Sequence, residues 1–199
     1  FDLRPEKNWA IFKYLKKHNK KIFLDALATD HYYVKACLDG KTFRYSDFFV
    51  GDRPLPHPER EKMLAAWIGG PNERPNIEMA QEANGIIACL YEYYAAYQPE
   101  YADKLAYIPI PIDLSINPFH PIKSTPEVVK FFIGIQQHRT AIKGTDILLD
   151  VLREIHDKYP RESHIQKVVS VPFDEYNKLL VDCHILLDQL YSYTPATNA

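Results

Sequence analysis

The chain has 199 residues, a mass of 23.1 kDa and a net charge of -2, with 46% hydrophobic and 25% charged residues. These values are typical of a globular protein with a sizeable core, and they exclude a disordered chain. The balance of 24 basic and 26 acidic residues does not favour a nucleic-acid partner or a polybasic membrane patch, and no apolar run is long enough to cross a bilayer.

The first half of the chain predicts alternating helices and strands. Residues 7–19 carry Ile11, Phe12 and Leu15 at helical spacing, with lysines opposite, so we expect an amphipathic helix that buries those three side chains. Short buried strands are expected over 22–26, 85–90 and 105–108, helices over 32–37 and 59–67, and an aromatic-rich helix or turn over 91–101. Around the helix at 59–67, prolines and glycines predict a long loop over 51–76.

The second half predicts a separate βαβ unit. Prolines between 113 and 126 indicate a linker at 114–125, which divides 1–113 from 126–199. Strands are expected over 128–133, 165–171 and 184–188, with a polar loop at 134–143. A helix is expected from Thr145, as its N-cap, to 158, and another over 174–181. On the first of these helices the predicted buried face comprises Ile147, Leu148, Val151, Leu152 and Ile155. This alternation favours a parallel sheet with helices on its faces.

The cysteines and the chain ends bear on the protein's compartment and completeness. Cys37, Cys89 and Cys183 are odd in number and far apart, which indicates buried thiols and not a disulfide framework or a zinc site. We therefore expect a reducing, cytoplasmic location.

The chain begins at Phe1, without a signal peptide, and ends soon after a strand, so we expect an internal piece of a longer protein that is inactive alone.

The strongest local signal for binding is two cations before a predicted helix. Arg139 and Lys143 precede Gly144 and the helix at 145, at the carboxyl end of a predicted parallel strand. A helix N-terminus offers free N–H groups, and Arg and Lys both bind phosphate. The sequence alone leaves two interpretations open, an anion site and a solvated loop with a turn at Gly144.

Two further groups have both a functional and a structural interpretation. His31 follows a strand and is either a donor to a sugar hydroxyl or an ordinary loop residue. A tyrosine cluster either stacks on sugar rings or packs in the core; it comprises Tyr91, Tyr93, Tyr94, Tyr97 and Tyr101.

Four segments, in this order, resemble the GT-B glycosyltransferases of the large retaining family 4. They are Tyr107 to Asp113 (YIPIPID), Phe132 to Asp146 with Arg139 and the Lys143-Gly144 pair, Val171 to Leu180 (VPFDEYNKLL), and Leu186 to Asn198. Two details depart from the family pattern. Arg139 lies only four residues before Lys143 and does not follow Gly134 directly, and no glutamate stands near residues 193–196.

The resemblance implies two incomplete Rossmann-like parallel-sheet domains of GT-B type that face a cleft. It implies transfer of a sugar from a nucleoside-diphosphate donor to a carbohydrate or lipid-linked acceptor hydroxyl, in surface polysaccharide or glycoconjugate synthesis, with peripheral membrane association of the full-length protein. No metal or other cofactor is implied. The alternatives are a sugar-nucleotide epimerase and an inactive homologue that serves as a binding subunit.

The same resemblance assigns roles to individual residues. Arg139, Lys143 and Gly144 would hold the donor diphosphate, and His31 would face the donor sugar as the catalytic residue. Apart from the resemblance, the residues near the end leave two interpretations open: a nucleotide or phosphate loop of Val171, Thr194, Thr197 and Asn198, or merely the cut end of the chain.

Overall fold

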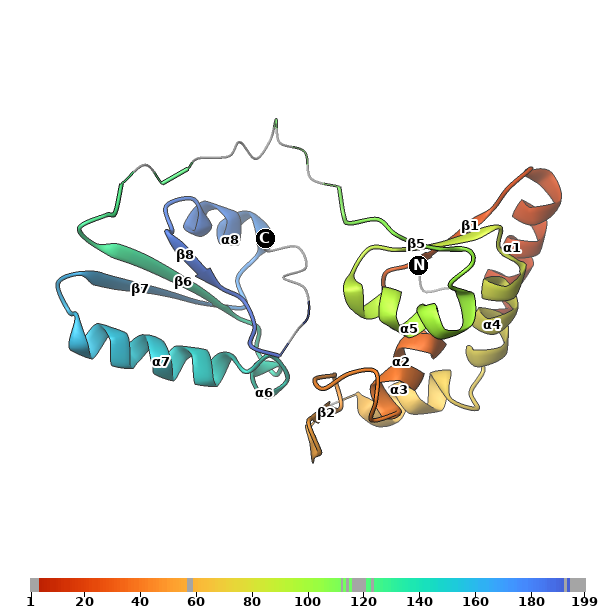
Figure 1. Cartoon of the computed structure of the whole chain (residues 1–199), viewed down its shortest axis with the longest axis horizontal. Coiled ribbons are helices and arrows are strands. Elements are labelled where there is room, and N and C mark those ends of the chain that lie inside the picture. Colours follow the sequence, from red (N-terminus) through yellow and green to blue (C-terminus); the bar gives the residue numbers. More distant parts are fainter. Residues whose placement is uncertain are drawn as a thin grey trace. The chain divides into compact units, whose positions relative to one another are not determined.

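The structure is a computed structural model, and it describes residues 4–56, 59–111, 113, 115, 121–122, 124–191 and 193. The chain forms two compact units, one of residues 1–54 and 58–111 and the other of residues 55–57 and 112–199 (Figure 1). Each unit contains a three-stranded parallel sheet, so the fold is α/β with parallel sheets, as predicted. Most of the predicted linker at 114–125 lies outside the described residues.

The sheet of the first unit has the strand order β1-β4-β5, all parallel. It consists of β1 (Phe23–Ala26), β4 (Gly85–Ala88) and β5 (Leu105–Tyr107). These are the three strands predicted for this half. A two-stranded antiparallel hairpin, β2 (Phe49–Val50) and β3 (Arg53–Pro54), was not predicted. It turns at Gly51, whose φ of 56° suits glycine.

The helices of the first unit are α1 (Pro5–His18), α2 (His31–Leu38), α3 (Arg60–Trp67), α4 (Glu73–Glu82) and α5 (Tyr91–Tyr101). Four of them were predicted, but α4 was missed because Pro75 made its start look like loop. Pro75 is the third residue of α4. Proline is tolerated in the first turn of a helix, where the backbone N–H has no intrahelical partner.

The predicted buried face of α1 is wrong in detail. Phe12 is buried and stacks on Trp9, with ring centroids 5.5 Å apart, but Ile11 and Leu15 are 45% and 42% exposed. On the same side, Lys16 pairs with Glu82 of α4 at 2.7 Å. The helix therefore turns the Trp9–Phe12–Lys16 side toward α4, and the apolar side chains of the other side stay in solvent.

Two of the five tyrosines of the predicted cluster belong to the core of the first unit. Tyr97 is fully buried and Tyr101 is 7% exposed, and both rings contact that of Tyr32. Tyr93 and Tyr94 are half-buried, and Tyr91 is 47% exposed. For the buried members, packing rather than sugar stacking is the role that the contacts support.

The sheet of the second unit has the order β7-β6-β8, all parallel. Its strands are β6 (Val129–Ile135), β7 (Ser163–Val169) and β8 (Ile185–Leu187), and its helices are α6 (Thr140–Lys143), α7 (Thr145–Lys158) and α8 (Phe173–Leu180). Figure 1 shows α7 and α8 on opposite faces of this sheet. This follows from two right-handed crossovers that run in opposite directions, one from β6 to β7 through α7 and one from β7 back past β6 to β8 through α8.

Three expectations for this unit need correction. The segment 134–143 is not all loop, because its end forms the one-turn helix α6. Thr145 is the first residue of α7, and Gly144 holds the N-cap position. Of the predicted apolar face of α7, Leu152 is buried, whereas Ile147 and Val151 are 43% and 45% exposed.

The three cysteines are free thiols, but only Cys37 is buried; Cys89 and Cys183 are half-exposed. Burial raises the pKa of the Cys37 thiol to about 12. Within the described residues, no helix is both long enough and apolar enough to span a bilayer.

Candidate functional site

A pocket of about 430 Å³ opens at the carboxyl edge of the second sheet. The chain leaves β6 toward β7 and then returns to the other side as β8, so the strand order reverses beside β6. In open parallel sheets, ligands bind in the crevice at such a switch point. The pocket is lined by Gly134, Ile135, Gln136, Lys143, Val168, Ser170, Val171, Phe173, Tyr176 and Asp188.

Lys143 and Asp188 give this pocket its charges. The Lys143 ammonium Nζ lies 3.5 Å from the Asp188 carboxylate Oδ1, and the two side chains are 18% and 12% exposed. Lys143 ends α6, and Asp188 follows β8. Lys143 is thus a partly desolvated cation with a long, loose ion pair, and an anionic ligand could compete with Asp188 for it.

Two glycines allow close approaches around the pocket. At Gly134, a Cβ would lie 2.9 Å from the ring of Tyr176, which covers the end of β6. Gly144 has a φ of 66°, and a Cβ there would lie 2.9 Å from Cβ of Leu190. The Leu190 N–H donates to the Lys143 carbonyl at 2.7 Å, which ties the end of α6 to the segment after β8.

The backbone around the pocket is strained at two non-glycine residues. Ser170 has a φ of 46° and His138 a φ of 67°. Ser170 is held there by hydrogen bonds, since its N–H donates to the Ile135 carbonyl and its Oγ accepts from the Gln137 N–H. Strain of this kind is concentrated at binding and catalytic sites.

Thr145, at the start of α7, has a fully buried side chain whose hydroxyl makes no hydrogen bond within the described residues. A buried hydroxyl without a partner costs about 1–3 kcal/mol. This part of the unit therefore carries an unmet hydrogen-bonding group next to Gly144 and Lys143.

The structure brings together only part of the predicted phosphate site. Lys143 and Val171 both line the pocket, and Gly144 adjoins it at the start of α7. Arg139 holds the N-cap position of α6 and is not among the lining residues. Thr194, Thr197 and Asn198 lie outside the described residues.

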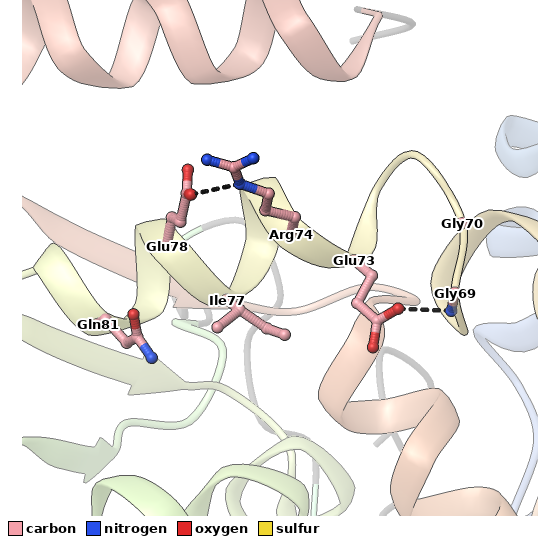
Figure 2. Close-up of a pocket in the computed structure, with 7 residues that line it drawn as sticks. All are labelled: Gly69, Gly70, Glu73, Arg74, Ile77, Glu78 and Gln81. Atoms are coloured by element: carbon pink, nitrogen blue, oxygen red, sulfur yellow. Dashed lines mark hydrogen bonds and ion pairs between the residues drawn. The ribbon is translucent and has the colours of Figure 1, made fainter.

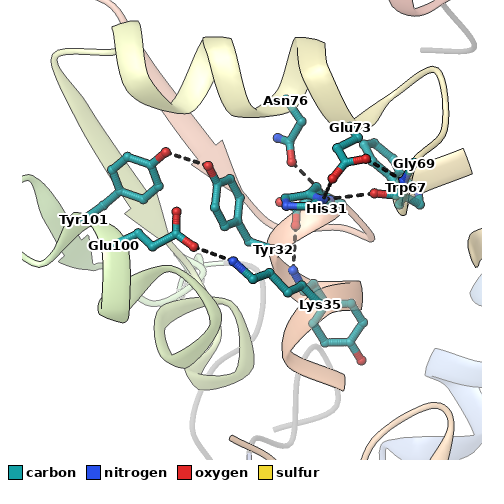
Figure 3. A network of polar contacts seen from close by, with 11 residues as sticks. His31, Tyr32, Lys35, Trp67, Gly69, Glu73, Asn76, Glu100 and Tyr101 are labelled. Atoms are coloured by element: carbon teal, nitrogen blue, oxygen red, sulfur yellow. Dashed lines mark hydrogen bonds and ion pairs between the residues drawn. The ribbon is translucent and has the colours of Figure 1, made fainter. Parts of the chain in front are cut away.

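In the first unit, the His31 ring is held in place at the start of α2 (Figure 3). Its Nδ1 lies 2.9 Å from the Trp67 carbonyl oxygen and 3.5 Å from Oε1 of Glu73. A carbonyl oxygen only accepts, so Nδ1 carries the proton of the neutral ring. Nε2 has no hydrogen-bond partner among the described residues, and in the neutral ring it is an acceptor. A neutral His31 would thus accept from a sugar hydroxyl, where we had predicted a donor.

Asp30, just before His31, anchors a buried polar network. Its carboxylate accepts from the Tyr33 N–H at 2.9 Å, which caps α2, and from the Tyr97 hydroxyl at 2.6 Å. Asn76 of α4 accepts from the His31 N–H and donates to the Tyr97 oxygen. Burial raises the pKa of the Asp30 carboxyl, and the hydrogen bonds from Tyr33 and Tyr97 oppose that shift.

A second pocket, of about 500 Å³, lies along α4 (Figure 2). Glu73 links it to His31, because one carboxylate oxygen accepts from the Gly69 N–H at 2.5 Å and the other lies 3.5 Å from the His31 ring. Farther along the helix, Arg74 pairs with Glu78 at 2.7 Å. The charged groups of this pocket are therefore already bound to one another or to the backbone.

The sequence did not single out Asp188, Ser170, Tyr176 or Glu73 as site residues. Asp188 ends an apolar strand, which was a usable signal, since carboxyl ends of parallel strands meet at one edge. No local sequence pattern predicts the left-handed backbone of Ser170. The contact of Glu73 with His31 could not be predicted either, because the helix that carries Glu73 was not predicted. Among the described residues, no group of three or more His, Cys, Asp or Glu side chains is placed to hold a metal.

Comparisons with known proteins give no relative for this chain. No family model, curated protein or solved structure matches it.

Proposed function

We propose that the protein is a GT-B glycosyltransferase that moves a sugar from a nucleoside-diphosphate donor to an acceptor hydroxyl. The single observation that carries the proposal is the placement of Lys143 in a pocket at the carboxyl edge of a parallel sheet, directly before the N-terminus of α7. The order of the four family-like segments supports the same assignment.

In this proposal the second unit binds the donor. Lys143 releases Asp188 and binds the diphosphate, while the N-terminus of α7 faces the same charge. As the bond from sugar to phosphate breaks, negative charge develops on the leaving diphosphate, and a fixed cation stabilises it most at that moment. The proposal assigns this stabilisation to Lys143, with Arg139 as a second cation, and to no metal.

The first unit would contribute His31. The Trp67 carbonyl and Glu73 fix the ring, so that Nε2 is presented in one orientation. His31→Ala in the full-length enzyme is then expected to lower turnover with little loss of nucleotide affinity, because the imidazole acts on the sugar and not on the diphosphate.

The test is a panel of nucleotide sugars offered to the full-length protein with candidate acceptors, read by product analysis. A new glycosidic product supports the proposal. An epimerised sugar nucleotide without acceptor glycosylation identifies the alternative enzyme, and binding without turnover identifies a binding subunit. In parallel, calorimetry with UDP, GDP and ADP on the present chain tests the donor site alone. If none of the three binds, the proposed donor site is wrong.

A further inference from the structure

The amino end of β8 is joined to β6 through one residue, His184, which lies just before β8. The His184 N–H donates to the Lys130 carbonyl at 2.8 Å, and its ring nitrogen Nδ1 accepts from the Lys130 N–H at 2.9 Å. In an ordinary parallel ladder, both of these bonds would go to the backbone of the neighbouring strand. Here a titratable side chain takes the place of one backbone carbonyl.

The bond to the ring matters because β8 is a short strand at the edge of its sheet. It has three residues, and in the described part of the chain its neighbour is β6 (Figure 1). Its first residue, Ile185, is 45% exposed, so burial does little to hold this end. The bonds from His184 to Lys130 therefore make up a large part of what fixes the amino end of β8.

The ring can accept this hydrogen bond only while it is neutral. Because Nδ1 accepts, it carries a lone pair, and the one proton of the ring is on Nε2. A second proton has to go to Nδ1, which then becomes a donor facing another donor, the Lys130 N–H. Histidine side chains take up that proton between about pH 8 and about pH 5. Protonation of His184 therefore removes the bond and places two N–H groups against each other.

We propose that His184 is a pH-sensitive clasp, which holds the amino end of β8 against β6 at neutral pH and releases it in acid. The effect extends to the Lys143 pocket, because the segment after β8 carries two contacts to Lys143. Asp188 lies 3.5 Å from its Nζ, and the Leu190 N–H donates to its carbonyl. Release of β8 loosens both contacts. The clasp acts whatever anion the pocket binds, so the inference is independent of the proposed sugar transfer.

The charged and titratable groups around His184 do not replace the hydrogen bond as the deciding influence. Lys130 on β6 carries a cation, and His164 on β7 is in register with it. In the turn before β8, Asp182 is anionic, whereas burial raises the pKa of the Cys183 thiol, which stays neutral. The side chains of Lys130, His164 and Asp182 are all exposed, so water and salt screen their charges.

The test is amide hydrogen exchange of the chain, followed by NMR at about pH 8 and about pH 5. Each rate is divided by the intrinsic rate at the same pH to give a protection factor. On acidification the Lys130 amide should lose protection roughly ten-fold, as expected for one hydrogen bond, and the Leu190 amide several-fold. Val129, the preceding residue of β6, is the internal reference, because its N–H donates to the Glu162 carbonyl on the β7 side at 2.7 Å. Its protection should not change.

Two variants separate the clasp from other titrations. His184→Asn keeps an acceptor oxygen on a side chain that does not titrate, so the Lys130 amide should keep its protection in acid. The matched control is His164→Asn, on the opposite side of Lys130, which should behave as the wild type does. Unchanged protection of Lys130 in the wild type, an equal loss at Val129, or the same loss in His184→Asn would overturn the clasp. A loss at Lys130 without one at Leu190 would overturn its effect on the pocket. No nucleotide sugar is present, so the outcome does not depend on the proposed transfer.

Discussion

Each unit carries a carboxylate after a parallel strand, Asp30 after β1 and Asp188 after β8, but the two units satisfy the surrounding polar groups differently. In the first unit, Asp30 and Asn76 are buried, and their side chains make hydrogen bonds to other groups of the protein. In the second, Lys143 and Asp188 are only 3.5 Å apart, Ser170 is strained, and the Thr145 hydroxyl has no partner in the described residues. In the first unit the Asp30 and Asn76 side chains are bonded without a ligand and, within the described part of this network, only Nε2 of His31 is left open, whereas the second arrangement retains unused binding capacity at a cation. That difference is the reason for placing the donor in the second unit.

The largest expected effect tests the packing of Gly144 beside the Lys143 pocket of the second unit. Gly144→Ala should lower the free energy of unfolding by roughly 3 kcal/mol, because the left-handed backbone disfavours a Cβ by about 1–2 kcal/mol and the contact with Leu190 adds to that. Urea unfolding followed by circular dichroism measures it. The control is Gly40→Ala, where φ is 64° but nothing lies within 4 Å of the new Cβ. An equal loss in both variants would mean that the Leu190 contact is unimportant.

The next effect concerns the buried network of the first unit. Tyr97→Phe should cost roughly 1.5–3 kcal/mol, because the Asp30 carboxylate then loses a hydrogen-bond donor while it stays buried. Both tryptophans, Trp9 and Trp67, lie in this unit, so their fluorescence during unfolding reports on it. Tyr93→Phe, at a half-buried ring of the same helix, should change stability by less than about 0.5 kcal/mol. Equal effects of the two changes would contradict the role given to the Asp30 bond.

A smaller contrast lies within the second unit. Ser163→Ala should cost about 1–2 kcal/mol, because its buried hydroxyl donates to the Tyr159 carbonyl at 2.6 Å and contacts His156. Thr145→Val removes a hydroxyl that makes no bond and keeps the shape, so it should be neutral or stabilising by up to about 1 kcal/mol. Thermal unfolding of the two variants gives the comparison. A loss at Thr145 as large as at Ser163 would show that the Thr145 hydroxyl has a partner after all.

The smallest expected effect is on how the stability of the first unit changes with pH. Because burial raises the pKa of Asp30 above its ordinary 3.8, the folded first unit holds that proton more tightly than the unfolded chain does. Its contribution to stability is therefore greatest below pH 3.8 and is lost as the pH rises through the higher folded value. Asp30→Asn should flatten this decline in fluorescence-monitored unfolding. A wild-type stability that instead rises across the same window, with the rise abolished in Asp30→Asn, would reverse the assignment.

The sequence predicted the strands and most helices because these follow from apolar runs and from clear breakers. It missed α4, where Pro75 lies in the first turn, and the one-turn α6, which is too short to show a period. It also misjudged which sides of α1 and α7 are buried, since Ile11 and Val151 fit the helical spacing yet face solvent. Periodicity identifies a helix, but neighbouring elements decide which of its apolar residues are covered.

Less of the candidate site was predictable than of the fold. Lys143 and Val171 could be predicted from the sequence because Lys143 lies just before the start of α7 and Val171 lies between β7 and α8, both at the carboxyl edge of the sheet. The Asp188 partner and the left-handed backbone of Ser170 depend on how β6, β7 and β8 meet. The ion pair and the backbone angle both depend on contacts between residues far apart in the sequence, so the sequence next to Asp188 or Ser170 does not predict them.

The most direct test of the account is the effect of Lys143 and Asp188 on nucleoside-diphosphate affinity, measured by calorimetry. Lys143→Ala should weaken binding about 10- to 100-fold through loss of a charge-assisted hydrogen bond, and Asp188→Asn should strengthen it several-fold by removing the competing carboxylate. The matching nucleoside without phosphates should bind all three proteins equally. If Lys143→Ala has no effect, or weakens nucleoside and diphosphate alike, the pocket does not bind the diphosphate and the proposed donor site is wrong.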